Sequence, residues 1–244
     1  MSDWTQAYFD DIYRRLFLET VDPARTKYQV KQLFTLCPVL PGSSILDVGC
    51  GLGRHSLEMA RLGFRVTGID MNAGYVEMCR ASAAELGVNA EFVASDSRVM
   101  DLGFQADLVV SLWSSFGYYG DKEDAGILER FALHVKPRGH VIIDVENRDY
   151  IVRHFVPEEW HEAQGWTVLE RRRFNAIRGT VTTRRTVIGH DFRKEYQRVL
   201  RMYTAAELCT KLSDAGLNTM NIFGDYNGSR FGLESRRMII IAER

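Results

Sequence analysis

The chain has 244 residues, a net charge of −1 and 45% hydrophobic residues. This composition is typical of a globular protein and excludes a disordered or collagen-like chain. No apolar run approaches the roughly 20 residues that a membrane-spanning helix needs. No basic segment followed by an apolar one begins the chain, so we expect a cytoplasmic protein without a secretion signal. The four cysteines lack C-x-x-C spacing, which favours reduced thiols over disulfides or a metal site.

The first 40 residues are predicted to form an N-terminal helical lid. Two helical patterns occupy residues 5–40, and the first places Tyr8, Ile12 and Leu16 on one face. Pro38 and Pro41 end the second pattern.

Residues 41–150 are predicted to form an α/β core. Strands are expected at 45–48, 65–70, 92–97, 107–113 and 141–145, with helices at 55–62, 72–86 and 121–135 between them. Asn72 is the expected cap of the second of these helices and Gly87 its stop. Strands that alternate with helices pair in parallel through right-handed crossovers, so we expect a doubly wound sheet.

Residues 151–202 break this alternation. Three strand-like runs at 166–174, 180–188 and 192–202 are separated by short turns, which predicts an antiparallel β insertion on the acceptor side. The core is expected to return over residues 203–244. A helix begins with a capping box at Thr204 and Glu207, and two closing strands near 221–223 and 237–242 complete a mostly parallel seven-stranded sheet.

A glycine-rich segment after the first core strand carries the strongest functional signal. Gly49, Gly51 and Gly53 follow Asp47 at alternate positions and lead into a helix. Such a loop presents unpaired backbone N–H groups and the positive end of the helix dipole to an anionic group. Asp70 ends the second strand, 23 residues after Asp47, and a carboxylate there can accept both hydroxyls of a ribose. The two features together indicate a nucleoside cofactor.

The spacing of the glycines selects among nucleoside cofactors. A dinucleotide fingerprint requires a small third residue, but Arg54 or Ser56 stands there. The segment instead resembles motif I of the class I S-adenosylmethionine-dependent methyltransferases, D-x-G-x-G-x-G. The resemblance extends over residues 42–147, with further acid-ended strands at Asp70 and Asp96. It implies a Rossmann-like fold and S-adenosylmethionine as the cofactor.

The resemblance implies specific cofactor contacts. Asp47 would support the glycine loop, Asp70 would bind the ribose, and Asp96 would accept from the adenine amine beside Ser97. Each has a plainer alternative: a loop-bracing carboxylate, an exposed strand-end acid, and a turn-forming Asp-Ser pair. The residues expected at the cofactor are Asp47, Gly49, Cys50, Gly51, Gly53, Arg54, Asp70, Met71, Asp96, Ser97 and Leu112.

The acceptor side is less strongly marked. The loop 111–119 follows the fourth strand, at the end that faces the crevice, and its aromatic rings can attract a sulfonium or an amine. Simple core packing explains them as well. The N-terminal tyrosines resemble the lid helix of small-molecule members, and two polar residues follow the fifth strand. The expected acceptor contacts are Tyr8, Tyr13, Trp113, Tyr118, Asn147 and Arg148.

No catalytic side chain is identified, because the cofactor itself carries the electrophile. His55, His140 and His154 are available as bases, but no second residue marks any of them. Residues 114–117 depart from the N/D-P-P-Y/F motif of methyltransferases that act on nucleobase amines or protein glutamine.

The β insertion is rich in arginine, for example Arg172 and Arg173, which must point to opposite faces of a strand. We favour a solvated face whose cations pair with Glu170, Asp191 and Glu195, ahead of a site for an acidic small molecule or RNA. Three functions stay open: methyl transfer to an amine or hydroxyl of a small molecule, which we favour; methyl transfer to a protein or RNA; and non-catalytic nucleoside binding. Homo-oligomer formation is not decided by the sequence, and no metal site is expected.

Overall fold

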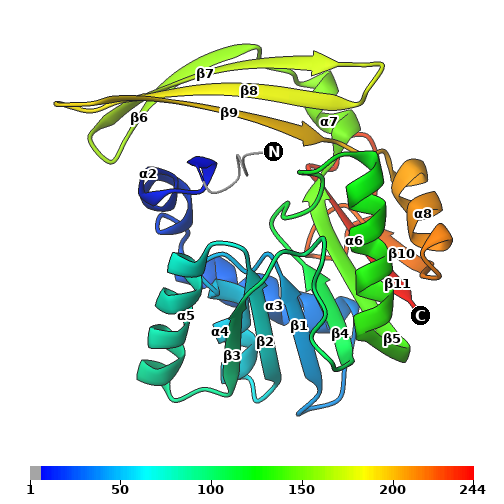
Figure 1. Cartoon of the computed structure of the whole chain (residues 1–244). Coiled ribbons are helices and arrows are strands. Elements are labelled where there is room, and N and C mark those ends of the chain that lie inside the picture. The colour runs from blue at the N-terminus through cyan, green and yellow to red at the C-terminus, as the bar shows by residue number, and fades with distance from the viewer. Residues whose placement is uncertain (1–6) are drawn as a thin grey trace.

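The computed structural model describes residues 7–244 and contains two sheets joined by the chain that follows the fifth strand (Figure 1). The larger sheet has seven strands in the order β10-β11-β5-β4-β1-β2-β3. β11 runs antiparallel to both β5 and β10, and the other pairs are parallel. Its strands are β1 Ser44–Val48, β2 Arg65–Asp70, β3 Ala90–Ala94, β4 Ala106–Ser111, β5 Val135–Glu146, β10 Asn218–Phe223 and β11 Arg237–Glu243. The predicted mostly parallel, doubly wound sheet is confirmed.

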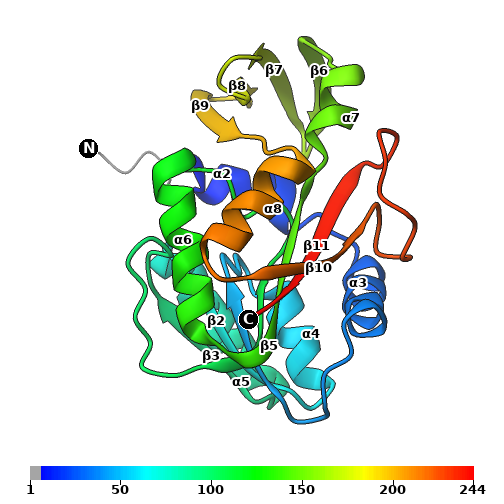
Figure 2. The ribbon, with the colours of Figure 1, turned by 90° about the vertical axis from the view of Figure 1, so that its right-hand side faces the viewer.

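Helices cover both faces of this sheet, as the side view in Figure 2 shows. Successive residues of a strand point to opposite faces. Ile45 accordingly packs with α3 (Pro23–Leu36) and α4 (Arg54–Arg61), whereas Leu46 packs with α6 (Asp121–His134) and α8 (Ala205–Asp214). The central strands β1, β4 and β11 are therefore buried on both faces, whereas the edge strands β3 and β10 are largely exposed.

The predicted helix boundaries are confirmed where capping residues marked them. Asn72 accepts a hydrogen bond from the Tyr75 backbone N–H at the start of α5 (Ala73–Leu86), and Gly87 ends this helix with a φ of +61°. Thr204 and Glu207 form the predicted capping box of α8.

The second sheet is an antiparallel meander of four strands, one more than the sequence predicted. Its strands are β6 Glu158–Ala163, β7 Trp166–Asn175, β8 Thr180–Ile188 and β9 Arg193–Arg201. The extra strand is β6, and α7 (Arg148–Arg153) was also missed. Nearly every residue of β6 is exposed, so its sequence carries no hydrophobic alternation that could have predicted it.

The N-terminal segment lies between the two sheets (Figure 1). Where the sequence predicted the first helix, it forms α2 (Asp11–Tyr13) and a short π-helical turn, η1 (Arg14–Leu18), and residues 5 and 6 of that prediction lie outside the described residues. Tyr8 and Leu16 pack against Val168, Val187 and Tyr196 of the meander. Within residues 7–244, no helix is long and apolar enough to span a bilayer.

Candidate functional site

A cavity opens at the carboxyl ends of β1, β2 and β4, in the place where the sequence predicted the cofactor. In open α/β sheets this end of the strands forms the binding crevice. All predicted cofactor residues line the cavity except Gly53 and Asp96, and three predicted acceptor residues, Tyr13, Trp113 and Tyr118, line it as well. Residues of the cavity wall that the prediction left out include Phe9, Leu18, His55, Tyr75, Ser95, Ser115 and Tyr119.

The glycine loop needs glycine for two different reasons. Gly49 has a φ of +76°, and a Cβ on it would lie 2.8 Å from the Cβ of Ser115. Gly53 has a φ of +70° at the N-cap of α4, and a Cβ there would lie 3.0 Å from the Cys79 sulfur and from the Phe92 ring. Gly49 therefore shapes the cavity floor, whereas Gly53 lets α4 begin close to α5 and β3.

Two backbone N–H groups fix the Asp70 carboxylate at the cavity wall. Its Oδ2 accepts from the Gly51 N–H and its Oδ1 from the Asn72 N–H, each at 2.9 Å. Burial raises the pKa of the carboxyl, and these two backbone hydrogen bonds lower it in part. A carboxylate held in this way keeps lone pairs for a neighbouring pair of hydroxyl groups.

Asp47 lies beneath the loop, with only 2% of its surface exposed. It accepts a hydrogen bond of 2.5 Å from the Ser56 hydroxyl in the first turn of α4. Burial raises the pKa of this carboxyl to about 6, although the Ser56 hydrogen bond opposes the shift. The side chain thus joins the end of β1 to the start of α4, as the loop-supporting role requires.

Arg54 offers the cavity a cationic N–H group. Its Nη1 donates to Thr26 Oγ1 at 2.9 Å and to Gln29 Oε1 at 2.8 Å. Its Nη2 is buried and has no hydrogen-bond partner among residues 7–244. Burial lowers the pKa of the guanidinium to about 10, which still leaves it charged at neutral pH. An unpartnered buried donor beside the glycine loop fits the carboxylate of an amino acid.

Neighbouring His55 is held in a neutral state by the same environment. Burial, then the charges of Arg54 and Arg237, lower the pKa of its imidazole well below the usual range. Its Nε2 lies 3.1 Å from Gln29 Oε1. The ring is therefore engaged in holding Gln29.

The loop after β4 carries backbone strain at the cavity wall. Trp113 and Ser114 have φ values of +59° and +60°, a region that residues other than glycine rarely adopt. Asp144, which is fully buried, holds both residues: its carboxylate accepts from the Trp113 N–H at 3.0 Å and its carbonyl from the Ser114 N–H at 2.9 Å. Arg237 Nε and the Tyr226 hydroxyl donate to the same carboxylate. The loop conformation is thus determined by a buried charge.

The sequence suggested that the Trp113 ring contacts the acceptor, but in the structure arginine side chains lie over this ring. The guanidinium groups of Arg54, Arg25 and Arg237 lie 4.5, 4.6 and 5.8 Å from the ring centroid. The ring therefore helps to hold Arg54 at the cavity, and it belongs to the cofactor end of the site.

Asp96 is not at the cavity wall, contrary to its predicted place. Its carboxylate accepts hydrogen bonds from the Arg98 side chain and from the Arg98 N–H. The two serines beside it, Ser95 and Ser97, line the cavity instead. The plainer sequence reading, a turn-forming Asp-Ser pair, describes Asp96 better.

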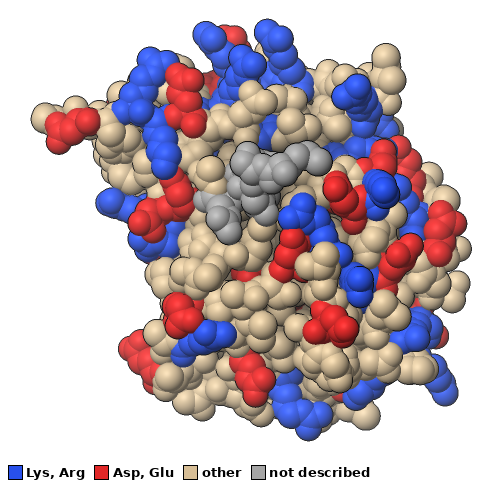
Figure 3. Space-filling model, in the orientation of Figure 1, with Lys and Arg blue, Asp and Glu red and all other residues tan. Residues whose placement is uncertain are grey.

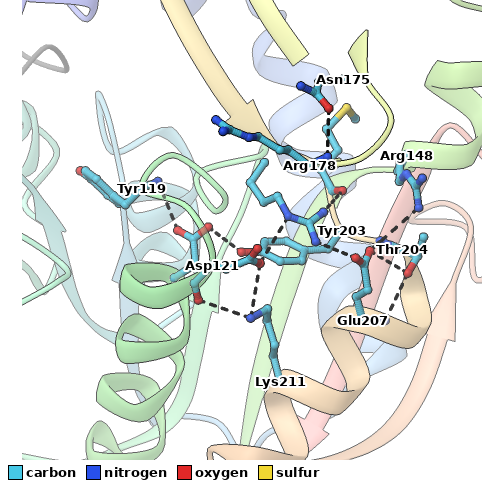
Figure 4. A network of polar contacts seen from close by, with 12 residues as sticks. Tyr119, Asp121, Arg148, Asn175, Arg178, Tyr203, Thr204, Glu207 and Lys211 are labelled. Carbon is cyan, nitrogen blue, oxygen red and sulfur yellow. Dashed lines mark hydrogen bonds and ion pairs between the residues drawn. The ribbon is translucent and has the colours of Figure 1, made fainter. Parts of the chain in front are cut away.

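Asn147 and Arg148 also lie outside the cavity, contrary to the prediction. Asn147 is 2% exposed and donates to the carbonyls of Gly232 and Ser235. The Arg148 guanidinium lies 4.0 Å from Glu207, in the polar network of α8 that Figure 4 shows. Topology placed both residues near the carboxyl end of β5, but their side chains turn toward the neighbouring loop and helix.

The predicted lid tyrosines separate in the structure. Tyr13 lines the cavity, whereas Tyr8 is buried against the meander and lies outside it, contrary to the prediction. The Tyr8 hydroxyl accepts from Arg185 Nη1 at 3.0 Å. The rings of Tyr8 and Tyr13 both pack on the Phe9 ring, with centroid distances of 5.1 and 4.9 Å. The Tyr118 ring lies on Phe9 as well, with its centroid at 5.6 Å.

Many charges of the meander are paired, but the predicted solvated face is confirmed only in part, because the Glu170–Arg185 pair is buried and Asp191 meets no arginine or lysine among the described residues. Glu170 binds both Arg172 and Arg185, and Arg193 pairs with Glu195, while Asp191 contacts its neighbour His190. Lys and Arg gather along the upper rim of the face in Figure 3, with Asp and Glu among them. No His, Cys, Asp or Glu cluster within residues 7–244 could hold a metal ion, and the four cysteines are free.

Comparison with known proteins identifies the core. Residues 45–139 match the model of a methyltransferase domain family. A ubiquinone biosynthesis O-methyltransferase of Coxiella burnetii is 25% identical over 149 residues, which cover 61% of each chain. A cypemycin N-terminal methyltransferase of a Streptomyces species is 26% identical over 84% of each chain.

Similarity to solved structures extends further along the chain. The methyltransferase CcbJ of Streptomyces caelestis superposes with a TM-score of 0.80 over 93% of both chains, at 19% identity. The shared fold thus includes the segments outside the domain match. The domain match, the sheet order and the cavity at the strand ends together support a class I S-adenosylmethionine-dependent methyltransferase, with the family match itself confined to residues 45–139.

Proposed function

We propose that the protein transfers the methyl group of S-adenosylmethionine to an amine or hydroxyl of a small-molecule acceptor. The observation that carries this proposal is that Asp70 and Arg54 line the same cavity. Asp70 offers a fixed carboxylate for the ribose hydroxyls, and Arg54 offers an unpartnered N–H for the carboxylate of the methionine part. A nucleoside that carries an amino acid satisfies both ends.

When bound, S-adenosylmethionine supplies an electrophilic methyl group on a positively charged sulfur. Direct transfer needs no protein nucleophile, so the tasks of the chain are to position the two reactants in line and to exclude water. The Gly49 loop and Trp113 would hold the methionine end. The rings of Phe9, Tyr13 and Tyr118 would then cover the acceptor from the lid side.

The phenols at the acceptor side act as hydrogen-bond donors in this proposal. Burial is the main reason that the pKa values of Tyr13 and Tyr118 are raised, so both hydroxyls stay protonated at neutral pH. His55 is neutral but engaged with Gln29. An amine acceptor would therefore enter unprotonated, attack with its lone pair and lose a proton once transfer is complete, whereas a hydroxyl acceptor would have to enter as its anion.

A small acceptor is favoured by the closed shape of the acceptor side. The N-terminal segment packs between the sheets, and its aromatic residues contact the cavity directly. The C. burnetii and Streptomyces relatives are named as an O- and an N-methyltransferase, so both kinds of acceptor atom fit the proposal.

A transfer assay with fractionated extracts tests the proposal. The protein is incubated with S-adenosylmethionine and either a metabolite pool, a protein pool or an RNA pool, and S-adenosylhomocysteine is measured. We expect turnover with the metabolite pool and none with Asp70→Ala. Turnover with only the protein or RNA pool, or none with any pool despite cofactor binding, would contradict the proposal.

A further inference from the structure

One arginine of the meander stands apart from the paired cations around it. The face of the meander that meets the lid carries Arg185 of β8 and, on β9, Lys194 and Arg198. The charge of Arg198 acts on the Tyr118 phenol and lowers its pKa against the effect of burial, and the Arg198 guanidinium lies 5.9 Å from the Tyr8 ring centroid. Because Tyr118 lines the cavity, Arg198 lies directly behind the acceptor wall.

The other cations of this face are neutralised. Arg185 pairs with Glu170, which also binds Arg172, and Lys194 pairs with Asp10 of the lid. Arg198 has no carboxylate within 4.0 Å in the part of the chain that the structure describes. Its Nε is buried and finds no hydrogen-bond partner there.

The surroundings of Arg198 keep it charged. Burial opposes the charge, but Tyr8, Tyr118 and Tyr13, followed by Glu146, raise the pKa of the guanidinium above its usual value. A buried cation without an ion-pair partner is costly, and such groups are commonly retained where a ligand supplies the opposite charge. Three phenols and one guanidinium form an environment that favours an anion with oxygen acceptors.

We propose that Arg198, with the phenol groups of Tyr13 and Tyr118, binds a carboxylate of the acceptor. The substrate is then a small carboxylic acid methylated on another of its groups, an amine or a hydroxyl. A single unpaired cation matches a single negative charge. This inference rests on the proposed function, since it names the chemical class of the same acceptor.

A purely structural role for Arg198 makes a different prediction. An arginine that only packs on Tyr8 would support folding but would give no preference between an acid and its neutral amide. The measurement that separates the two roles is therefore the ratio of the affinity for the acid to the affinity for its amide. A general loss of stability does not change this ratio.

The experiment is a calorimetric titration of the S-adenosylhomocysteine-saturated protein. The probes are benzoate against benzamide and phenylacetate against phenylacetamide. The two members of each pair have the same ring, so both can pack equally well on Phe9, Tyr13 and Tyr118. For the wild type we expect at least one acid to bind about tenfold more tightly than its amide, the strength of a charge-assisted hydrogen bond. We expect Arg198→Gln to abolish that preference and Arg198→Lys to keep part of it.

Arg184→Gln is the matched control. Arg184 is the neighbour of Arg185 on β8, but it is exposed and its guanidinium donates to Gln197 Oε1. It must leave the preference for the acid unchanged. Affinity for S-adenosylhomocysteine is measured in each variant, and Arg198→Lys preserves the test if Arg198→Gln does not fold.

The outcomes separate this inference from the proposed function. If no acid binds more tightly than its amide in the wild type, or if the preference survives in Arg198→Gln, the carboxylate site is wrong while the cofactor site stands. If the wild type does not bind S-adenosylhomocysteine, the proposed function itself fails.

Discussion

The two sides of the cavity are built in different ways. The cofactor side uses loops at the ends of neighbouring strands, so its contacts, such as Gly51 N–H to Asp70, are mostly made by the backbone. The proposed acceptor side uses side chains from segments far apart in the chain, such as Phe9 and Tyr118, whose ring centroids lie 5.6 Å apart. The difference implies that cofactor binding tolerates changes in the lid, whereas acceptor binding depends on how the lid and the meander pack together.

The largest effect on the cofactor side is expected for Asp70→Ala. The variant loses two charge-assisted hydrogen bonds to the ribose, each of about 1.5–3 kcal/mol, so affinity should fall at least about 100-fold. Calorimetric titration with S-adenosylhomocysteine measures it. Asp101→Ala, at an exposed carboxylate, is the control and should bind like the wild type. Equal affinity in the wild type and Asp70→Ala would refute the ribose assignment.

Asp47 predicts a pH dependence of stability. Its carboxyl loses the proton near pH 3.8 when unfolded and near pH 6 when folded, because burial disfavours the charge. Raising the pH between these values therefore favours the unfolded chain, and the full loss is present above about pH 6. Relative to Asp47→Asn, the wild type should lose roughly 2 kcal/mol of unfolding free energy from pH 4 to pH 7.

Denaturant unfolding at several pH values measures this difference, and Asp107 supplies a control of opposite sign. Although burial opposes it, hydrogen bonds from Lys136 and Ser44 lower the pKa of the Asp107 carboxyl to about 2. Relative to Asp107→Asn, the free energy of unfolding of the wild type should increase as the pH rises from about 2 to 4. It should decrease again as the pH falls through the same range. A pH-independent difference for Asp47→Asn would contradict the raised pKa.

A smaller effect on the cofactor is expected for Arg54→Gln. Removing the guanidinium should weaken S-adenosylhomocysteine binding about tenfold, the value of one charge-assisted hydrogen bond. Adenosine, which lacks the amino acid, should bind equally to the variant and the wild type. Arg61→Gln at the far end of α4 serves as the control. A matching loss of adenosine affinity would show that Arg54 does not contact the methionine end.

The smallest effect is expected on the acceptor side, for Tyr8→Phe. The variant loses the hydrogen bond from the charged Arg185, worth about 1.5 kcal/mol of unfolding free energy. Affinity for S-adenosylhomocysteine should not change, because Tyr8 lies outside the cavity. The KM of an acceptor found in the transfer assay should rise. An altered cofactor affinity would break the distinction between the two sides.

The cofactor side could be predicted from the sequence because its determinants are local. Glycines that require positive φ follow one strand, and Asp70 ends the next, so a short motif and a spacing describe them. The helix ends at Asn72, Gly87 and Thr204 were predictable for the same reason. For Asp96 the sequence did not show that the neighbouring Arg98 binds its carboxylate, because strand order does not reveal such a contact.

The acceptor side could not be predicted to the same extent, because long-range packing determines it. Nothing in the sequence near Tyr8 indicates that Arg185 lies beside it. Asp144 reads as part of an apolar strand, yet it holds the loop at Trp113. Asn147 and Arg148 follow the expected strand, but their partners lie in the loop before β11 and in α8.

The central claim is that the cavity at the ends of β1, β2 and β4 is shaped for S-adenosylmethionine. Calorimetric titration of the protein with S-adenosylhomocysteine and, separately, with NAD tests it most directly. We predict saturable binding of S-adenosylhomocysteine with one site per chain and no measurable binding of NAD. Tighter binding of NAD, or no binding of S-adenosylhomocysteine, would contradict it.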